Sequence, residues 1–250
     1  MQQVRYVWPP LTPGVKALLI LYAACFVPVL LGGTLGIDGF LVRYLMLSNE
    51  GLLGHLYLWQ PLTHQWLHDG FLHLLFNGLV LYSFGGPVEQ RLGWPKLVAL
   101  VHACGLGGAL ATILTRLVFP VAIGPEGFSV VQTVGASGGI YGVVMAFSLY
   151  HWDAPMRLLL IPGAVQGKWL IPAFLAIDVL MTLLGGAPLA LASHVGGALT
   201  ALLLLGSTGG LRPLLDDLKL WRARRRLRAL RGGGHPLEQD PKRPPGGWMN

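Results

Sequence analysis

The pattern of hydrophobic and polar positions divides the chain into long apolar runs that are separated by more polar connections. Each run approaches the ~20 residues that a helix needs to cross a lipid bilayer. We expect six membrane-spanning helices, at about 15–36, 71–89, 95–119, 136–151, 168–185 and 189–206. The pattern therefore predicts an all-α membrane protein that crosses the bilayer several times.

The connection between the first two predicted spans, residues 37–70, does not resemble an ordinary loop. It is long and rich in Leu, Tyr and Trp. A loop in water would not expose so many apolar side chains, whereas Trp and Tyr are favoured at the membrane–water interface. We therefore expect short helices that lie partly in the interface.

The composition supports a membrane protein and argues against a nucleic-acid-binding one. Hydrophobic residues make up 53% of the chain and charged residues only 12%, which is too little charge to cover a soluble surface. The formal net charge of +7 is concentrated near one end, because ten of the 18 Lys and Arg residues follow residue 211. We expect this basic tail to bind anionic lipid, and we expect no nucleic-acid partner.

Lys and Arg also predict the orientation of the chain in the membrane. With the N-terminus in the cytoplasm, sixteen of the 18 basic residues fall on the inner side and only Arg43 and Arg116 fall outside. Both termini are thus predicted to be cytoplasmic. We recognise no cleavable signal or targeting presequence, which favours a bacterial plasma membrane.

Three regions are predicted along the chain. A short cytoplasmic lead-in, 1–13, precedes the six-helix core, 14–206, and a basic cytoplasmic tail, 207–250, follows it. Within the tail, residues 214–230 have the pattern of an amphipathic helix that would lie on the inner membrane surface. The Gly- and Pro-rich residues after 232 are predicted to be disordered.

Ser137 lies close to several glycines at the start of the fourth apolar segment, and this stretch has two interpretations. Small residues are common where membrane helices pack closely, so the stretch could be a packing surface. Alternatively, Gly135 and Gly138 would let a substrate approach, and the amides of a helix N-terminus can hold an oxyanion. The second interpretation makes Ser137 a nucleophile, which then needs a base and further donors.

Polar residues in two other spans supply candidates for these roles. His73 and Asn77 are four residues apart and share one face of the second span, and His194 lies in the sixth span just before two glycines. In the predicted orientation these three residues and Ser137 all fall in the outer half of the membrane at similar depth. A nucleophile, a base and two side-chain donors at one level meet the requirements of acyl transfer.

Two further polar features leave alternatives open. Asp178 lies inside the fifth span, where a carboxylate is either functional or is protonated or hydrogen-bonded at a helix contact. His64 and His68 are four residues apart and could suggest a metal site together with His73. The chain has no His-Glu-x-x-His pattern and no placed third ligand there, so we expect no metal and no cofactor.

From about Trp59 to Leu205 the chain resembles the rhomboid intramembrane serine proteases. Four motifs carry the resemblance, in the order and spacing of the family: His73-Leu-Leu-Phe-Asn77, Gly85-Gly-Pro-Val-Glu-Gln-Arg-Leu-Gly93, Gly135-Ala-Ser137-Gly138 and His194-Val-Gly-Gly197. The resemblance implies a six-helix catalytic core and a serine–histidine dyad without a third carboxylate. Ser137 would be the nucleophile and His194 the general base.

The resemblance also implies supporting roles around this dyad. His73, Asn77 and the backbone amide of Ser137 would form the oxyanion hole. Tyr141 would stack on the catalytic imidazole, Gly197 would permit close approach of the fourth and sixth helices, and Glu89 and Arg91 would make structural contacts at the inner end. The chain departs from the family pattern at three positions. It has Gln60 where the family often has Arg, Ser193 where it often has Ala, and Ala201 where it often has Gly.

These observations together predict an intramembrane serine endopeptidase that cleaves transmembrane protein substrates near the outer membrane face. The alternative is a catalytically silent relative that binds transmembrane helices without cutting them. A small-solute transporter is a third class, and it is disfavoured because the inverted repeat common among transporters is not evident.

Overall fold

The computed structural model describes residues 10–119, 132–156, 164–184 and 188–206, together with 216, 219–223 and 227 of the tail. Contacts group the chain into two units, Met1–Leu211 and Arg212–Asn250, and each is considered by itself. In the tail, the described part of the predicted amphipathic helix is helical, and its other residues lie outside the described ranges. Most of the lead-in and the end of the chain that is predicted to be disordered also lie outside the described ranges.

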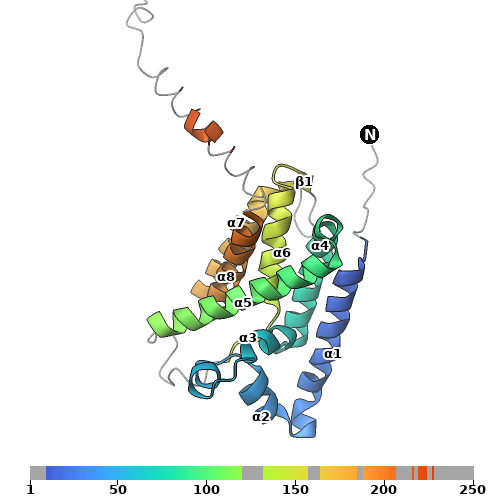
Figure 1. The fold of residues 1–250 in the computed structure, drawn as a ribbon, viewed down its shortest axis with the longest axis vertical. Coiled ribbons are helices and arrows are strands. Elements are labelled where there is room, and N and C mark those ends of the chain that lie inside the picture. Colours follow the sequence, from blue (N-terminus) through green and yellow to red (C-terminus); the bar gives the residue numbers. More distant parts are fainter. Residues whose placement is uncertain are drawn as a thin grey trace, which may run out of the picture. The chain divides into compact units, whose positions relative to one another are not determined.

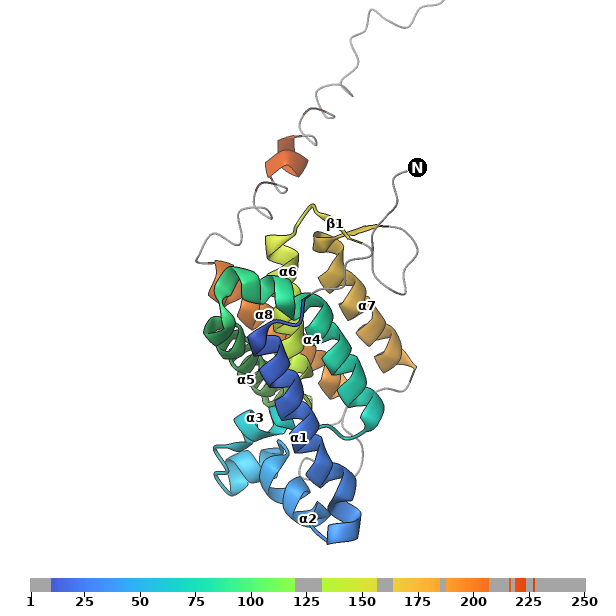
Figure 2. The same ribbon diagram turned by 90° about the vertical axis from the view of Figure 1, so that its right-hand side faces the viewer.

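The first unit is mostly helical, and each of the six predicted segments contains one long helix (Figures 1 and 2). These helices are α1 (Pro13–Leu35), α4 (Phe71–Leu92), α5 (Trp94–Val118), α6 (Ser137–Tyr150), α7 (Leu170–Leu183) and α8 (Pro188–Leu205). Among the described residues, α1, α4 and α5 are long and apolar enough to cross a membrane, and α6 and Leu189–Leu205 are shorter apolar helices. The all-α membrane architecture is thus confirmed in outline.

Short helices occupy the connection between α1 and α4, as the sequence predicts. They are α2 (Asp38–Phe40), the π-helical turns η1 (Leu41–Leu45) and η2 (Glu50–Gly54), α3 (Gln60–Thr63) and the 3-10 turn η3 (His64–Trp66). Gln60 is fully buried and ties them together: its Nε2 donates to the carbonyl of Arg43 at 2.9 Å and its Oε1 accepts from the Ser48 amide at 3.2 Å. Glutamine therefore maintains polar contacts in this connection at the position where the family often has arginine.

A two-stranded antiparallel ladder between α6 and α7 has no counterpart in the sequence prediction. It pairs β1 (Pro155–Met156) with β2 (Val165–Gln166), and the 3-10 turn η5 (Gly167–Trp169) leads from it into α7. Two-residue strands are too short to show an alternating pattern, so periodicity could not indicate them.

Helix α6 is the centre of the unit, in contact with α4, α5, α7 and α8 (Figures 1 and 2). Eleven of its 14 residues are buried. Glycines bring α5, α6 and α8 into backbone contact, since a Cβ on Gly197 would overlap the Gly138 carbonyl and one on Gly108 would lie 2.7 Å from the Ser193 carbonyl oxygen. The close approach of the fourth and sixth predicted helices is therefore confirmed, and it uses small residues as membrane helices commonly do.

The helix ends at one side of the unit are joined by polar contacts. Glu89 of α4 accepts hydrogen bonds from the start of α1, from Thr12 Oγ1 at 2.5 Å and from the Gly14 and Val15 amides at 2.9 Å each. Arg91 lies over the Tyr150 ring at the end of α6. The contacts expected of Glu89 and Arg91 are thus present, and they show that α4 and α6 end where α1 begins.

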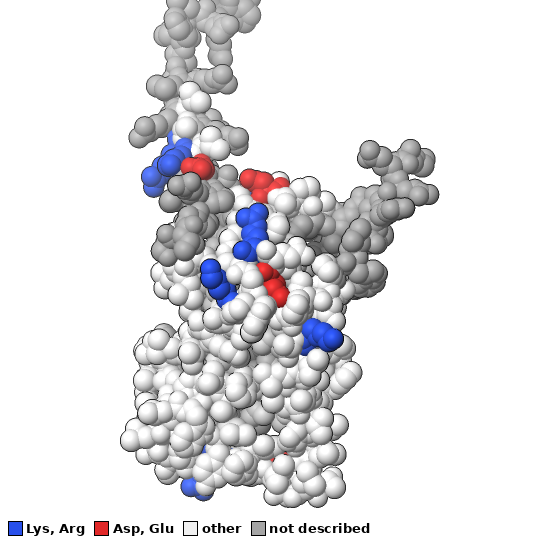
Figure 3. All heavy atoms as spheres, turned by 45° about the vertical axis from the view of Figure 1, so that its right-hand side comes forward, with Lys and Arg blue, Asp and Glu red and all other residues white. Residues whose placement is uncertain are grey.

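The surface of the first unit matches an integral membrane protein. In the view of Figure 3 its charged side chains gather mainly toward one end, and a broad band of the surface carries almost none. Exposed Leu, Ile, Val and Phe side chains are frequent on α1, α4, α5, α7 and α8. A band of this kind suits the hydrocarbon core of a bilayer.

Candidate functional site

Ser137 is the first residue of α6, and the segment before it is held in place from both sides. Thr133 forms a backbone bridge with Leu47, and its hydroxyl accepts a 2.7 Å hydrogen bond from the buried side chain of Arg116. The Gly135 amide donates to the His64 carbonyl at 2.9 Å. The start of α6 is therefore anchored to α5 and to the short helices.

The backbone turns into α6 through Gly135, whose φ of +127° is rarely adopted by L-residues. The first bond at the start of the helix runs from the Ile140 amide to the Ala136 carbonyl, at 3.0 Å. The amides of Ser137, Gly138 and Gly139 precede this bond and have no acceptor within the helix. They are available to a negatively charged group at this position.

His73 lies in the first turn of α4, against the same glycine. A Cβ on Gly135 would be 2.7 Å from His73 Nε2 and 3.8 Å from Ser137 Oγ, so the imidazole and the serine hydroxyl share this neighbourhood. On its other side, His73 Nδ1 pairs with Asp69 Oδ1 at 2.5 Å. Asp69 was not among the residues predicted from the sequence, although its four-residue spacing from His73 is typical of two side chains that contact one another.

Asn77 is one helical turn after His73 and is 7% exposed. Its Nδ2 is buried and has no hydrogen-bond partner in the part of the chain that the structure describes. An unpaired buried donor is unusual, because leaving such a group unsatisfied costs about 1–3 kcal/mol. Asn77 Nδ2 is one of several buried side-chain atoms without a partner within the described residues, and it is a donor on the same α4 face as His73.

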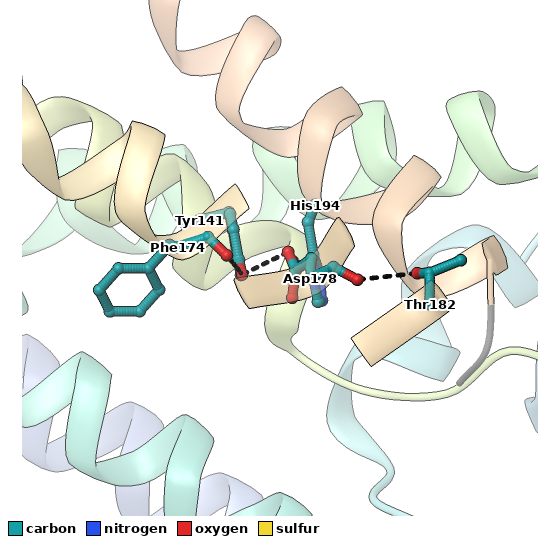
Figure 4. A network of polar contacts seen from close by, with 5 residues as sticks. All are labelled: Tyr141, Phe174, Asp178, Thr182 and His194. Carbon is teal, nitrogen blue, oxygen red and sulfur yellow. Dashed lines mark hydrogen bonds and ion pairs between the residues drawn. The ribbon is translucent and has the colours of Figure 1, made fainter. Parts of the chain in front are cut away.

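His194 of α8 is held by residues from two other helices (Figure 4). The Tyr141 ring of α6 stacks on its imidazole, with the ring centroids 4.0 Å apart and the planes 9° from parallel. His194 Nδ1 lies 2.8 Å from Asp178 Oδ2 of α7, and the same oxygen accepts a 2.5 Å hydrogen bond from Tyr141 Oη. The stack implied by the resemblance is present, and a carboxylate accompanies it.

The expectation that no carboxylate accompanies His194 is therefore wrong. Of the two interpretations of Asp178, the hydrogen-bonded helix contact is present, and its partners are the candidate base and the tyrosine that stacks on it. The signal lay in the spacing from the turn between α7 and α8. Asp178 lies five residues before the last residue of α7 and His194 six residues after the first residue of α8, which puts them at one level in an antiparallel pair.

Ser137 is related to His194 through the contacts of α6. Tyr141 is four residues after Ser137 and on the same helix face, and it stacks on His194. Gly138, the neighbour of Ser137, packs against Gly197 on the helix that carries His194. The structure thus brings Ser137 and His73 together at Gly135, brings His194, Tyr141 and Asp178 together, and puts Asn77 on the same α4 face as His73.

His64 and His68, in the connection between α1 and α4, are packed inside the unit. His64 Nδ1 lies 2.9 Å from the Gln60 carbonyl oxygen, and His68 packs edge-on against Tyr22 and His73. Within the described ranges no three His, Cys, Asp or Glu side chains are grouped as a metal site would require. Burial lowers the pKa of His64 to about 4, and burial together with the neighbouring His73 lowers the pKa of His68 to about 4.

These two pKa shifts predict a loss of stability in mild acid. Both histidines are neutral in the folded protein down to about pH 4, whereas in the unfolded chain they take up protons below about pH 6.5. The unfolded state then binds more protons, so stability is complete above pH 6.5 and falls as the pH drops toward 4. We expect the unfolding midpoint in detergent to fall across this range, and to fall less for His68→Phe. A midpoint that does not change with pH would contradict the prediction.

Comparisons with known proteins find similar proteins for most of this chain. A family model described as the Rhomboid domain matches residues 55–208. The Rhomboid protease GlpG of Serratia proteamaculans (strain 568) is 31% identical over 212 residues, which cover 82% of this chain and 64% of that protein. The Rhomboid protease GlpG of Yersinia pestis (strain Pestoides F) is 29% identical over the same shares. The chain thus spans about 64% of the length of these relatives.

Proposed function

This chain belongs to the rhomboid family, and from this premise we propose that it is an intramembrane serine endopeptidase that cleaves transmembrane-helix substrates. The observation that carries the proposal is the held imidazole of His194, which α6 and α8 bring to the helix face that begins with Ser137. A serine at a helix N-terminus and an imidazole that is oriented by a residue of the same helix are the parts that nucleophilic catalysis requires.

In the proposed mechanism Ser137 Oγ attacks the carbonyl carbon of a substrate peptide bond. His194 Nε2 takes the hydroxyl proton and later gives it to the leaving amine. The oxyanion is stabilised by the Ser137 amide and by the unpaired Nδ2 of Asn77, and by His73 Nε2 when both ring nitrogens of His73 carry a hydrogen. Water then hydrolyses the acyl-enzyme and restores the serine.

The same proposal includes a membrane topology and a preference for certain substrate sequences. The six long helices span the membrane, the short helices of the first connection lie partly in the outer interface, and both termini are cytoplasmic. The site is then in the outer half of a bacterial plasma membrane, and the basic tail contacts anionic lipid. Because helical peptide bonds are shielded by their own hydrogen bonds, favoured substrates have Gly, Pro or small residues near the cut.

A fluorophosphonate probe tests the proposal, because it reacts with activated serines. We expect purified wild-type protein to form one adduct, which mass spectrometry locates at Ser137, and to cleave a model transmembrane substrate in liposomes. A folded protein that binds the substrate helix but neither reacts with the probe nor cleaves it would instead be the catalytically silent relative. An adduct at a different serine would overturn the site.

The variant Asn77→Ala tests the oxyanion role separately. We expect kcat to fall by about 10²-fold or more, as removal of one oxyanion donor typically causes. The unfolding midpoint should stay the same or rise, because the replaced amide has no partner for its buried Nδ2 within the described ranges. Ser83→Ala is the matched control, since Ser83 lies on the same helix and its hydroxyl donates to the Leu79 carbonyl. Unchanged kcat in Asn77→Ala would contradict the assignment.

A further inference from the structure

We propose that Asp178 is a positioning residue for His194, holding the imidazole in the tautomer whose Nε2 is free to take the proton of Ser137. This inference rests on the proposed function, and it adds to the serine and histidine a third residue that contacts the base from α7. Asp178 is not expected to touch the substrate.

The hydrogen-bond chemistry of the contact determines the tautomer. An ionised carboxylate can only accept, so at 2.8 Å from Asp178 Oδ2 the Nδ1 of His194 must carry the hydrogen. In the neutral imidazole Nε2 then has the lone pair, which is the form a general base needs. Stacking on Tyr141 fixes the plane of the ring but does not distinguish its two nitrogens.

The carboxylate itself is well supported at this position. Its Oδ2 accepts from both Tyr141 Oη and His194 Nδ1, and the side chains of His194 and Asp178 are only 12% and 17% exposed. Within the described ranges no Lys or Arg forms an ion pair with Asp178. Buried charges are costly when unpaired, so the charge of Asp178 is best balanced when His194 becomes an imidazolium.

This arrangement assists the proposed proton transfer without any proton reaching Asp178. In the first step the Ser137 O–H bond breaks and a His194 Nε2–H bond forms, while Nδ1–H continues to donate to the carboxylate. The positive charge on the imidazole is stabilised by the adjacent negative one. The proton then leaves Nε2 for the substrate amine, and the neutral imidazole returns to its starting tautomer.

A competing role for Asp178 is to attach α7 to the rest of the unit. The buried residues of α7 are Leu170 and Ile171 in its first turn, and several later side chains, such as Ile177 and Leu183, are exposed. The bonds of Asp178 therefore also hold the second half of α7. If this were its only role, its loss would change access for a bulky transmembrane substrate but not the reactivity of Ser137 toward a small probe.

The experiment compares Asp178→Asn and Asp178→Glu with wild type, with Ile177→Ala as the matched control on the exposed side of α7. Two quantities are measured: the second-order rate constant of fluorophosphonate labelling, and kcat and KM for a transmembrane substrate. For Asp178→Asn we expect labelling and kcat to fall by similar factors of about 10²-fold or more, with little change in KM. An asparagine amide can donate to Nδ1 and so favours the wrong tautomer. Glutamate should restore part of the rate, and Ile177→Ala should resemble wild type.

Each other outcome has a defined meaning. Wild-type labelling in Asp178→Asn, with or without altered substrate cleavage, would overturn the positioning role and leave the attachment of α7. A wild-type protein that reacts no faster than Ser137→Ala would instead mean that the proposed function is wrong. If Asp178→Asn does not fold, Tyr141→Phe replaces it, because it keeps the stacked ring and removes one donor to the carboxylate. A lower labelling rate then supports the positioning role, and an unchanged rate overturns it.

Discussion

The variant Ser137→Ala should neither cleave a transmembrane substrate nor react with a fluorophosphonate, while it folds like wild type. The reason is that, in the proposed mechanism, the oxygen of this hydroxyl forms the acyl-enzyme. Loss of a nucleophilic serine typically costs on the order of 10⁴–10⁶-fold in kcat. The measurement is the cleavage rate in liposomes, together with the unfolding midpoint.

Ser148→Ala provides the matched control for this variant. Ser148 is a buried serine of the same helix whose hydroxyl bonds to the Val144 carbonyl, far along α6 from Ser137. We expect this control to keep its activity. Because alanine removes only one oxygen, Ser137→Ala should still bind the substrate and retain it uncut. Cleavage at the wild-type rate by Ser137→Ala would rule out the proposed nucleophile.

Replacing His194 by alanine should have an effect of similar size for a different reason. The serine is still present, but in the proposed mechanism its base is lost, so we expect kcat to fall by at least about 10⁴-fold. Any residual cleavage should rise about tenfold for each pH unit, because hydroxide or ionised serine must then do the work of the imidazole. The measurement is the rate of substrate cleavage as a function of pH.

The control for this variant is His151→Ala, at the opposite end of α6 from Ser137. His151 contacts the Phe147 ring, and within the described part of the chain its ring and hydrogen-bond contacts do not include a residue of the candidate site. It should change stability more than activity. Retention of wild-type kcat by His194→Ala would mean that another group acts as the base.

The arrangement of helices could be predicted from the sequence because hydrophobic runs of membrane length leave few alternatives. Each predicted segment lies within a few residues of a long helix, and the short helices of the first connection follow from its aromatic and apolar content. A shared level for Ser137, His194 and His73 was predicted from helix direction alone, and it remains a prediction. What periodicity could not supply was the local backbone, such as the positive φ of Gly135 or the π-helical turns.

The contacts of the candidate site were harder to predict, and α7 explains why. Apart from Asp178 and Thr182 its side chains are apolar, so no amphipathic pattern indicates which neighbouring helix Asp178 faces. Pairing it with His194 requires the position of the turn between α7 and α8 to within about a residue. The burial of Arg116 was not predicted for a similar reason. The sequence shows only a charge on the predicted outer side, whereas in the structure the side chain bonds to the Leu47 carbonyl and to Thr133.

The exposure of most of α7 has a consequence for when the proposed enzyme can act. The acceptor for the imidazole belongs to a helix that is buried mainly in its first turn. Any outward movement of the rest of α7 removes that acceptor. The imidazole then lacks the contact that orients it for as long as α7 is displaced. Under the positioning proposal, catalysis therefore depends on the position of α7. A substrate helix is cleaved only after α7 has returned to its place beside His194.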